Sequence, residues 1–325
     1  MASAARRPGR RRRGGLLLPL LCALLLLGPA GAAHIKKAEA AAPGEALRYL
    51  HSAELGEALR ALAAAAPPGL ARLFSIGQSV EGRPLWVLRL TAGLGPERDG
   101  EEPGGGEALP GRPQVKLVGN MHGDEPLARP LLLRLAQELV RGWAGGEERI
   151  GRLLNTTDIY LLPSLNPDGF ERAREGDCGG GAEGGRENSH GRDLNRSFPD
   201  QFGVAEPDLE PVPEVQALIA WMRRNKFLLS GNLHGGSVVA SYPYDDSPTH
   251  KPTGVYSKSA DDEVFKYLAK AYASHHPIMR TGKPNCPGEE GETFQDGITN
   301  GAQWYDVEEL TSKPVVMITE ERTAK

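Results

Sequence analysis

Short strand-like apolar runs alternate with helix-forming segments along most of this 325-residue chain. The strand-like runs are rich in Leu, Val and Ile and lie at residues 85–90, 114–118, 158–162 and 227–233. The segments of helical composition lie at residues 45–66, 126–143, 213–225 and 261–274. This alternation predicts an α/β domain in which helices flank a mixed, mostly parallel sheet. A chain of this length can bury one large core or two modest ones.

The first 33 residues have the composition of a secretory signal peptide. Basic residues at 6–13 precede an apolar run at 16–27, and small residues follow as far as Ala33. The apolar run is shorter than the roughly 20 residues that a membrane span needs, and an uncleaved anchor is the alternative interpretation. We therefore expect residues 1–33 to be removed. The mature chain is expected to have no membrane span and to be soluble in the secretory pathway or outside the cell.

The formal net charge of −4 gives the chain no general affinity for polyanions, so we expect no nucleic-acid partner. Beyond the signal peptide two cysteines remain, Cys178 and Cys286, and an oxidising compartment allows them to pair. The sequence does not place them within bridging reach, so their pairing stays open. Asn155 and Asn195 each begin an Asn-x-Ser/Thr sequon for glycosylation.

Two histidines and a glutamate follow the ends of predicted strands. His122 and Glu125 come after the run at 114–118, and His234 comes directly after the run at 227–233. In open α/β sheets, ligands bind in the crevice outside the carboxyl ends of the strands. Two imidazoles and one carboxylate suit a catalytic Zn²⁺, which takes three protein ligands and keeps a fourth position for water. A His-x-x-Glu pair alone is most often a pair of surface loop residues, so the prediction depends on the joint placement with His234.

Five motifs in a fixed order make the chain resemble the zinc metallocarboxypeptidases, in particular their regulatory (N/E) branch. They lie at residues 119–125, 163–170, 191–200, 232–236 and 299–305, and the similarity extends from about residue 45 to Val307. The resemblance implies the fold of that family. It also implies one Zn²⁺, held by His122, Glu125 and His234, and peptide or protein substrates.

The resemblance also implies roles in binding the substrate. Asn195 and Arg196 match the pair that binds the C-terminal carboxylate of a peptide, a task that suits the planar fork of Arg. Arg186 matches the arginine that stabilises the developing oxyanion. Without the family pattern, both arginines would be interpreted as solvated loop residues. A glycan on Asn195 would block this site, so we expect Asn155 to be the glycosylated sequon.

Two further roles rest on the same resemblance. Tyr305 matches the mobile tyrosine that closes over bound substrate, although a core tyrosine is the plainer interpretation. Asp245, eleven residues past His234, matches the floor of the side-chain pocket, where the plainer interpretation is a turn residue. A buried carboxylate there implies a preference for C-terminal Lys or Arg.

The resemblance stops near Val307. In this branch the general base is a glutamate about 22 residues beyond the position of Tyr305, and no residue of this chain matches it. Glu320 follows a strand-like run but lies only 15 residues beyond Tyr305. We therefore interpret residues 34–307 as an incomplete catalytic domain, with its last strand and terminal helices missing, and residues 308–325 as a divergent tail.

Two functions follow from this sequence. The first is a zinc metallocarboxypeptidase that removes C-terminal Lys or Arg from peptides and proteins. The alternative is a catalytically impaired isoform that binds zinc and basic C-termini without turnover, because the general base is absent. A different zinc hydrolase, such as a deacylase, is less favoured because Asn195 and Arg196 suit an α-carboxylate.

Overall fold

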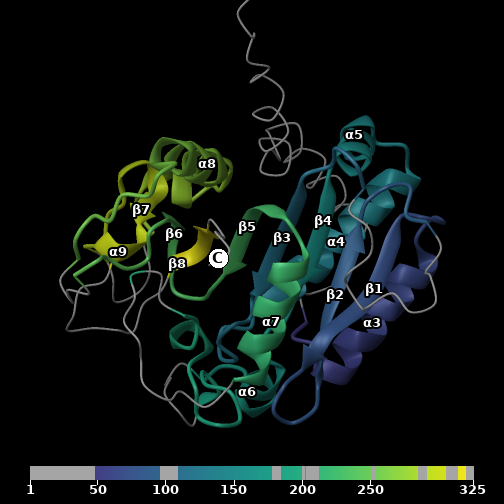
Figure 1. Ribbon diagram of the computed structural model, residues 1–325, viewed down its shortest axis with the longest axis horizontal. Coiled ribbons are helices and arrows are strands. Elements are labelled where there is room, and N and C mark those ends of the chain that lie inside the picture. The colour runs from purple at the N-terminus through teal and green to yellow at the C-terminus, as the bar shows by residue number, and fades with distance from the viewer. Residues whose placement is uncertain are drawn as a thin grey trace, which may run out of the picture.

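A single mixed sheet is the framework of the fold. The computed structural model describes residues 48–95, 109–177, 184–199, 202, 212–249, 254–284, 291–304 and 314–319. In this part of the chain, eight strands form one sheet with helices packed on both faces (Figure 1). Across the sheet the strands are β1 (Ala71–Gln78), β2 (Pro84–Leu90), β4 (Asp158–Leu162), β3 (Gln114–Gly119), β5 (Phe227–Leu233), β8 (Pro314–Thr319), β6 (Ser237–Tyr242) and β7 (Ile298–Asn300).

The strand pairings are mixed but more often parallel. β3 pairs in parallel with both β4 and β5, and β6 pairs in parallel with both β7 and β8. The pairs β1–β2, β2–β4 and β5–β8 are antiparallel. The predicted fold class, a mostly parallel mixed sheet flanked by helices, is confirmed.

Helices pack against both faces of the sheet. The α-helices of the described residues are α3 (Ser52–Ala65), α4 (Ala128–Ala144), α5 (Glu148–Thr156), α6 (Pro167–Arg172), α7 (Pro213–Arg224), α8 (Asp262–His275) and α9 (Gly301–Trp304). Short 3₁₀ turns are η2 (Leu194–Arg196), η3 (Met279–Thr281) and η4 (Gln295–Gly297).

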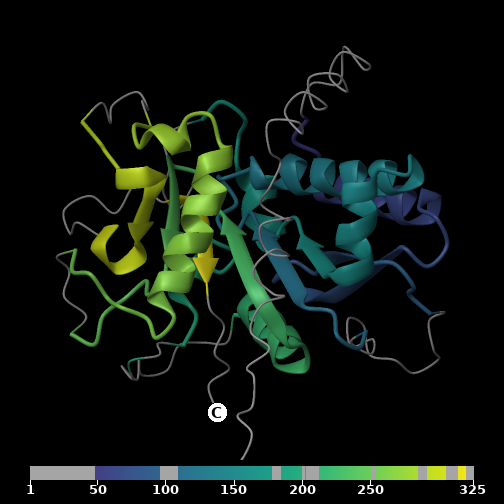
Figure 2. The same ribbon diagram turned by 90° about the horizontal axis from the view of Figure 1, so that it is seen from above.

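Successive side chains on a strand point to opposite faces, and this alternation produces two cores. On β4, Ile159 and Leu161 belong to the core beneath α3, α4 and α5. The intervening Tyr160 and Leu162 belong to the core beneath α7. A third core joins α8 to β5 and β6. Figure 2 shows the early elements at one end of the sheet and the late elements, in green and yellow, at the other.

The strands and helices predicted from the sequence are confirmed to within a few residues, apart from the start of the first helix. Within the described residues α3 begins at Ser52, where the His51 backbone N–H donates to Glu54 Oε2 at 2.9 Å and closes the N-terminus of the helix. The strands β1, β6 and β7 and the helices α5, α6 and α9 were not predicted. Strand β1 is only partly buried and mixes Arg72 and Ser75 with its apolar residues, so it lacks a continuous apolar run.

The strand-like run before Glu320 forms a strand. Residues 314–319, within the segment interpreted as a divergent tail, form β8 between β5 and β6. The run from Val315 to Thr319 is rich in β-branched residues, which favour extended backbone. A position between two strands also offers hydrogen bonds to both edges of the added strand.

Several predictions from the sequence fall outside the described residues. They concern the signal peptide at 1–33, Cys178, Cys286, Tyr305 and Glu320. Among the helices that the structure does describe, none combines the length and the apolar character needed to cross a bilayer.

A buried ion pair links β2 to β4. The side chains of Arg89 and Asp158 are 3% and 0% exposed. Arg89 Nε donates to Asp158 Oδ1 at 2.8 Å, and Nη2 donates to Oδ2 at 2.6 Å. Tyr160 Oη also donates to Oδ2, at 3.1 Å. The carboxylate therefore satisfies a guanidinium that has little access to water.

We predict that Asp158→Ala lowers the free energy of unfolding by about 3–5 kcal/mol, because the Arg89 charge stays buried without its partner. The control is Arg152→Ala, which breaks an ion pair with Glu148 whose side chains are 71% and 89% exposed. That variant is expected to lose less than about 1 kcal/mol. Urea unfolding followed by tryptophan fluorescence measures both. Equal, small losses in the two variants would contradict the prediction.

Candidate metal centre

The first two candidate ligands lie in the loop that joins β3 to α4. His122 is fully buried, and Glu125 is mostly buried. The loop passes close to the backbone of α6, since a Cβ on Gly123 would lie 2.1 Å from the carbonyl carbon of Gly169. Only glycine allows this approach, which fixes the path of the chain between the two ligands.

The third candidate ligand arrives from the neighbouring strand. β3 and β5 are parallel, and Gly119 pairs with Leu233, so His234 begins the loop that lies beside the loop of His122. A Cβ on Gly235 would lie 2.9 Å from Glu125 Cγ, and the Gly235 N–H donates to Glu125 Oε2 at 2.8 Å. The backbone that follows His234 therefore approaches the site closely.

The three side chains converge on one point. His122 Nδ1 lies 2.8 Å from Glu125 Oε1, and His234 Nδ1 lies 2.8 Å from Glu125 Oε2. The two Nδ1 atoms are 3.2 Å apart. One ligand atom from each residue lies within 4.8 Å of the others, and these three form the candidate metal-binding cluster of the described residues. Two nitrogens and a carboxylate directed at a shared centre are the donor set that Zn²⁺ takes.

The opposite nitrogen of each imidazole faces a side chain that orients the ring. His122 Nε2 lies 3.0 Å from Asp193 Oδ1. His234 Nε2 lies 3.0 Å from Asn232 Nδ2, while Asn232 Oδ1 is buried with no hydrogen-bond partner in the described part of the chain. Exchanging the O and N of this amide lets His234 Nε2–H donate to Asn232 Oδ1. Both rings then keep an Nδ1 lone pair for a metal, so the residues fit a bound zinc.

Arg186 adds a positive charge at the edge of the cluster. Its Nη2 donates to Asp193 Oδ2 at 2.9 Å and lies 3.0 Å from His122 Nε2. Its Nη1 donates to Glu125 Oε1 at 3.4 Å. The sequence analysis predicted Arg186 but missed Asp193, although Asp193 lies in the motif at 191–200. The signal was its place two residues before Asn195.

The environment shifts the pKa values of Asp124 and Glu125 in opposite directions. Burial alone raises the pKa of Glu125, but hydrogen bonds from His122 and His234 hold that pKa well below its usual range. Burial and the adjacent Glu125 charge raise the pKa of Asp124. Glu125 is therefore a carboxylate under ordinary conditions, as a metal ligand must be.

The predicted carboxylate-binding residues follow Asp193 in the same segment. Asp193 Oδ1 accepts from the Asn195 backbone N–H at 2.8 Å and so starts the turn η2. Asn195 is partly buried, whereas Arg196 is exposed and donates from Nη1 to the Asn195 carbonyl at 3.1 Å. One loop therefore contributes an orienting partner of His122 and the two predicted substrate-binding residues.

Asp245 is held by different elements. It lies in the loop after β6 and is partly buried. A Cβ on Gly301, at the start of α9, would lie 2.3 Å from Asp245 Oδ1. Tyr305 lies outside the described residues. The structure thus brings the three ligands and Arg186 together, and Asp245 remains a candidate that lies in a different loop.

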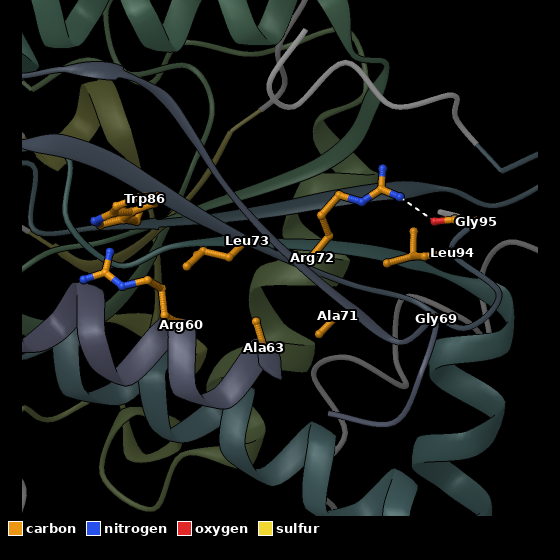
Figure 3. Close-up of a pocket in the computed structure, with 9 residues that line it drawn as sticks. All are labelled: Arg60, Ala63, Gly69, Ala71, Arg72, Leu73, Trp86, Leu94 and Gly95. Atoms are coloured by element: carbon orange, nitrogen blue, oxygen red, sulfur yellow. Dashed lines mark hydrogen bonds between the residues drawn. The ribbon is translucent and has the colours of Figure 1, made fainter. Parts of the chain in front are cut away.

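An open groove lies elsewhere on the molecule. It has a volume of about 520 Å³ between α3, β1 and the loops beside them (Figure 3). Its lining includes Arg60, Trp86 and Leu73, and Arg72 donates from Nη2 to the Gly95 carbonyl across its other end. No lining residue is a candidate metal ligand, so the groove is separate from the metal centre.

Comparison with known proteins identifies the family. The family model for zinc carboxypeptidase matches residues 57–316. The chain is 78% identical to Carboxypeptidase D of Anas platyrhynchos, over 95% of this chain and 24% of that protein. It is 70% identical to Carboxypeptidase D of Homo sapiens, over 82% of this chain and 20% of that protein. It is 42% identical to the Carboxypeptidase N catalytic chain of Homo sapiens, over 74% of this chain and 54% of that protein.

The chain thus spans about a quarter or less of these carboxypeptidase D proteins. Two solved structures share its fold. The crystal structure of thrombin activatable fibrinolysis inhibitor has a TM-score of 0.54 and 17% identity, over 84% of this chain and 66% of that chain. Carboxypeptidase A from Helicoverpa armigera has a TM-score of 0.54 and 19% identity, over 89% of this chain and 71% of that chain.

The family match includes all three candidate ligands and both strands that position them. The resemblance inferred from the five motifs is confirmed: the chain belongs to the zinc carboxypeptidase family.

Proposed function

We propose that this chain is a zinc-dependent carboxypeptidase that removes Lys or Arg from the C-termini of peptides and proteins. The observation that carries the proposal is the convergence of His122, Glu125 and His234 beside the guanidinium of Arg186. Such a site combines a metal with a fixed positive charge. The names of the relatives, carboxypeptidases D and N, support the same class of reaction.

In this proposal His122 Nδ1, His234 Nδ1 and the Glu125 carboxylate hold one zinc ion. A bound zinc polarises the scissile carbonyl and lowers the pKa of a coordinated water. Arg186 lies where its charge can stabilise an oxyanion next to the ligands, an effect on the order of 3 kcal/mol in comparable sites. Asn195 and Arg196 bind the α-carboxylate of the substrate, and Tyr305 closes over it.

Asp245 supplies the preference for basic residues. A partly buried carboxylate attracts the side chain of a C-terminal Lys or Arg and penalises an apolar side chain, which leaves the charge unpaired. Gly301 leaves the room that this carboxylate occupies. The signal-peptide pattern at 1–33 places the reaction in the secretory pathway or outside the cell.

A second candidate function is binding of zinc and basic C-termini without turnover. The observation that favours it is the register of β8 against β5. Val316 and Met317, which pair with Leu233 and Asn232 beside His234, are apolar, and the sequence of β8 contains no carboxylate. Thr319 pairs with Ser230, four residues before His234, and Glu320 lies outside the described residues.

Activity on matched peptides separates the two functions. We predict that the full chain, purified and loaded with zinc, cleaves a peptide that ends in a free Arg and leaves the same peptide with an amidated C-terminus intact. His122→Ala is expected to lose zinc and to lower kcat/KM at least about 100-fold, because one of three ligands is removed. His190→Ala, an exposed histidine outside the ligand set, serves as the control.

The zinc content and the rate of cleavage decide the outcome together. One zinc per chain with no turnover of the free-acid peptide would favour the binding function. Wild-type protein that holds no zinc would contradict both functions.

Asp246 provides a control for the assignment of Asp245 to the substrate pocket. We predict that Asp245→Ala lowers the preference for Arg over Leu at the C-terminus at least about 30-fold, because the ion pair with the substrate is lost. Asp246→Ala is expected to leave the preference unchanged, since Asp246 Oδ1 accepts a local hydrogen bond from the Ser247 N–H at 2.6 Å. The measurement is the ratio of kcat/KM values, or of peptide Kd values if turnover is absent. An unchanged ratio in Asp245→Ala would rule out the assignment.

Glycosylation is expected at Asn155 and not at Asn195. Asn155 is exposed, whereas the side-chain nitrogen of Asn195, to which a glycan would be attached, is buried. Mass analysis of tryptic peptides from secreted protein tests this prediction. A glycan on Asn195 would contradict both the prediction and the role of Asn195 in binding substrate.

A further inference from the structure

Asn120 occupies the turn between β3 and the ligand loop, residues 121–125. It is fully buried, and its φ of 53° lies in the left-handed region, which Asn adopts more readily than most residues. Its Nδ2 donates to three carbonyl oxygens of the loop: those of His122 at 2.7 Å, Gly123 at 3.1 Å and Glu125 at 3.3 Å. One amide group therefore holds the backbone of two of the three candidate ligands.

The oxygen of the Asn120 amide accepts two hydrogen bonds. Its Oδ1 accepts from Ser164 Oγ at 2.8 Å and from Arg129 Nη1 at 3.3 Å. Arg129 Nη1 also donates to Ser164 Oγ at 2.6 Å. Because one end of the amide faces only acceptors and the other only donors, its partners fix its orientation. The loop is thereby tied to α4 through Arg129 and to the end of β4 through Ser164.

Arg129 is an unusual residue to bury. It is 1% exposed, and in the described part of the chain no carboxylate forms an ion pair with it. Its guanidinium lies 3.6 Å from the centre of the Phe170 ring, and Nη2 donates to the Leu50 carbonyl at 2.8 Å. Burial lowers the pKa of Arg129 to about 10. The nearby charge of Glu171 offsets only part of the effect of burial. A buried cation is costly, so the guanidinium depends on its hydrogen bonds to Asn120 and Ser164.

We propose that Asn120 is a positioning residue for the ligand loop, and that Arg129 and Ser164 hold the Asn120 side chain in place. The inference rests on the proposed zinc centre. None of the three touches a ligand side chain in the described contacts; they act through the loop backbone. Without the amide, three carbonyls lose their common donor, and the loop no longer presents His122 Nδ1 and the Glu125 carboxylate to one point.

Two substitutions distinguish the contribution of the Asn120 amide from that of the left-handed backbone conformation. Asn120→Gly keeps the left-handed conformation and removes the amide, whereas Asn120→Asp keeps the shape but presents acceptors to the three carbonyls. Ser164→Ala removes one donor to Asn120 and is the milder variant. Asn225→Ala is the control, since Asn225 is also buried and donates to a backbone carbonyl, that of Trp221, at 2.8 Å, at the end of α7.

The test measures metal binding by the folded, full-length protein. The Kd for zinc is obtained by competition with a chromophoric chelator, and the visible absorption of bound Co²⁺ reports the geometry of the site. We expect both Asn120 variants to raise the Kd for zinc about 10- to 100-fold and to alter the cobalt spectrum. Ser164→Ala is expected to raise the Kd several-fold, and Asn225→Ala to leave Kd and spectrum unchanged.

Each outcome decides the inference. Wild-type Kd and cobalt spectrum in folded Asn120→Gly and Asn120→Asp would overturn it and leave the proposed zinc centre intact. If both variants fail to fold, wild-type metal binding by Ser164→Ala overturns it, and a raised Kd supports it. Absence of zinc from the wild-type protein would overturn the zinc centre, and the inference with it.

Discussion

The parallel pairing of β3 with β5 is the constraint on which the site depends. It aligns Gly119 with Leu233, so the loops that follow the two strands emerge side by side. His122 and His234 are more than a hundred positions apart in the chain, yet their Nδ1 atoms lie 3.2 Å apart. A shift of one residue in this register would turn every side chain of β5 to the opposite face. Val115 of β3 and Leu229 of β5 pack into the same core beneath α8, which holds that register in place.

Around this framework, several buried polar groups have defined partners. Asp193 lies between His122 and Arg186, and the backbone of the ligand loop is bonded to the amide of Asn120. The same pattern holds away from the site, where Arg89 and Asp158 satisfy each other inside the sheet. Low local dielectric makes such networks strong when complete and costly when broken. The site is therefore rigid through its surroundings rather than through its ligands alone.

Much of this was predictable from the sequence, because periodic apolar runs and strand-end residues are local signals. The alternating pattern predicted the central strands, and the placement of His122, Glu125 and His234 predicted the metal centre. The partners of the ligands were not predicted, since Asp193 reaches His122, and Ser164 reaches Asn120, from segments distant in the chain. The run of β8 was recognised as strand-like, but its place between β5 and β6 was not predicted, because the comparison of motifs stopped at Val307.

X-ray absorption at the zinc edge of the full-length chain, loaded with one equivalent of zinc, tests the central claim most directly. The account predicts a single zinc with nitrogen and oxygen neighbours at about 2.0–2.2 Å, including the scattering pattern of two imidazoles, and no sulfur. A sulfur shell at about 2.3 Å, or a signal from only one imidazole, would contradict the assignment of His122, Glu125 and His234 as the ligand set.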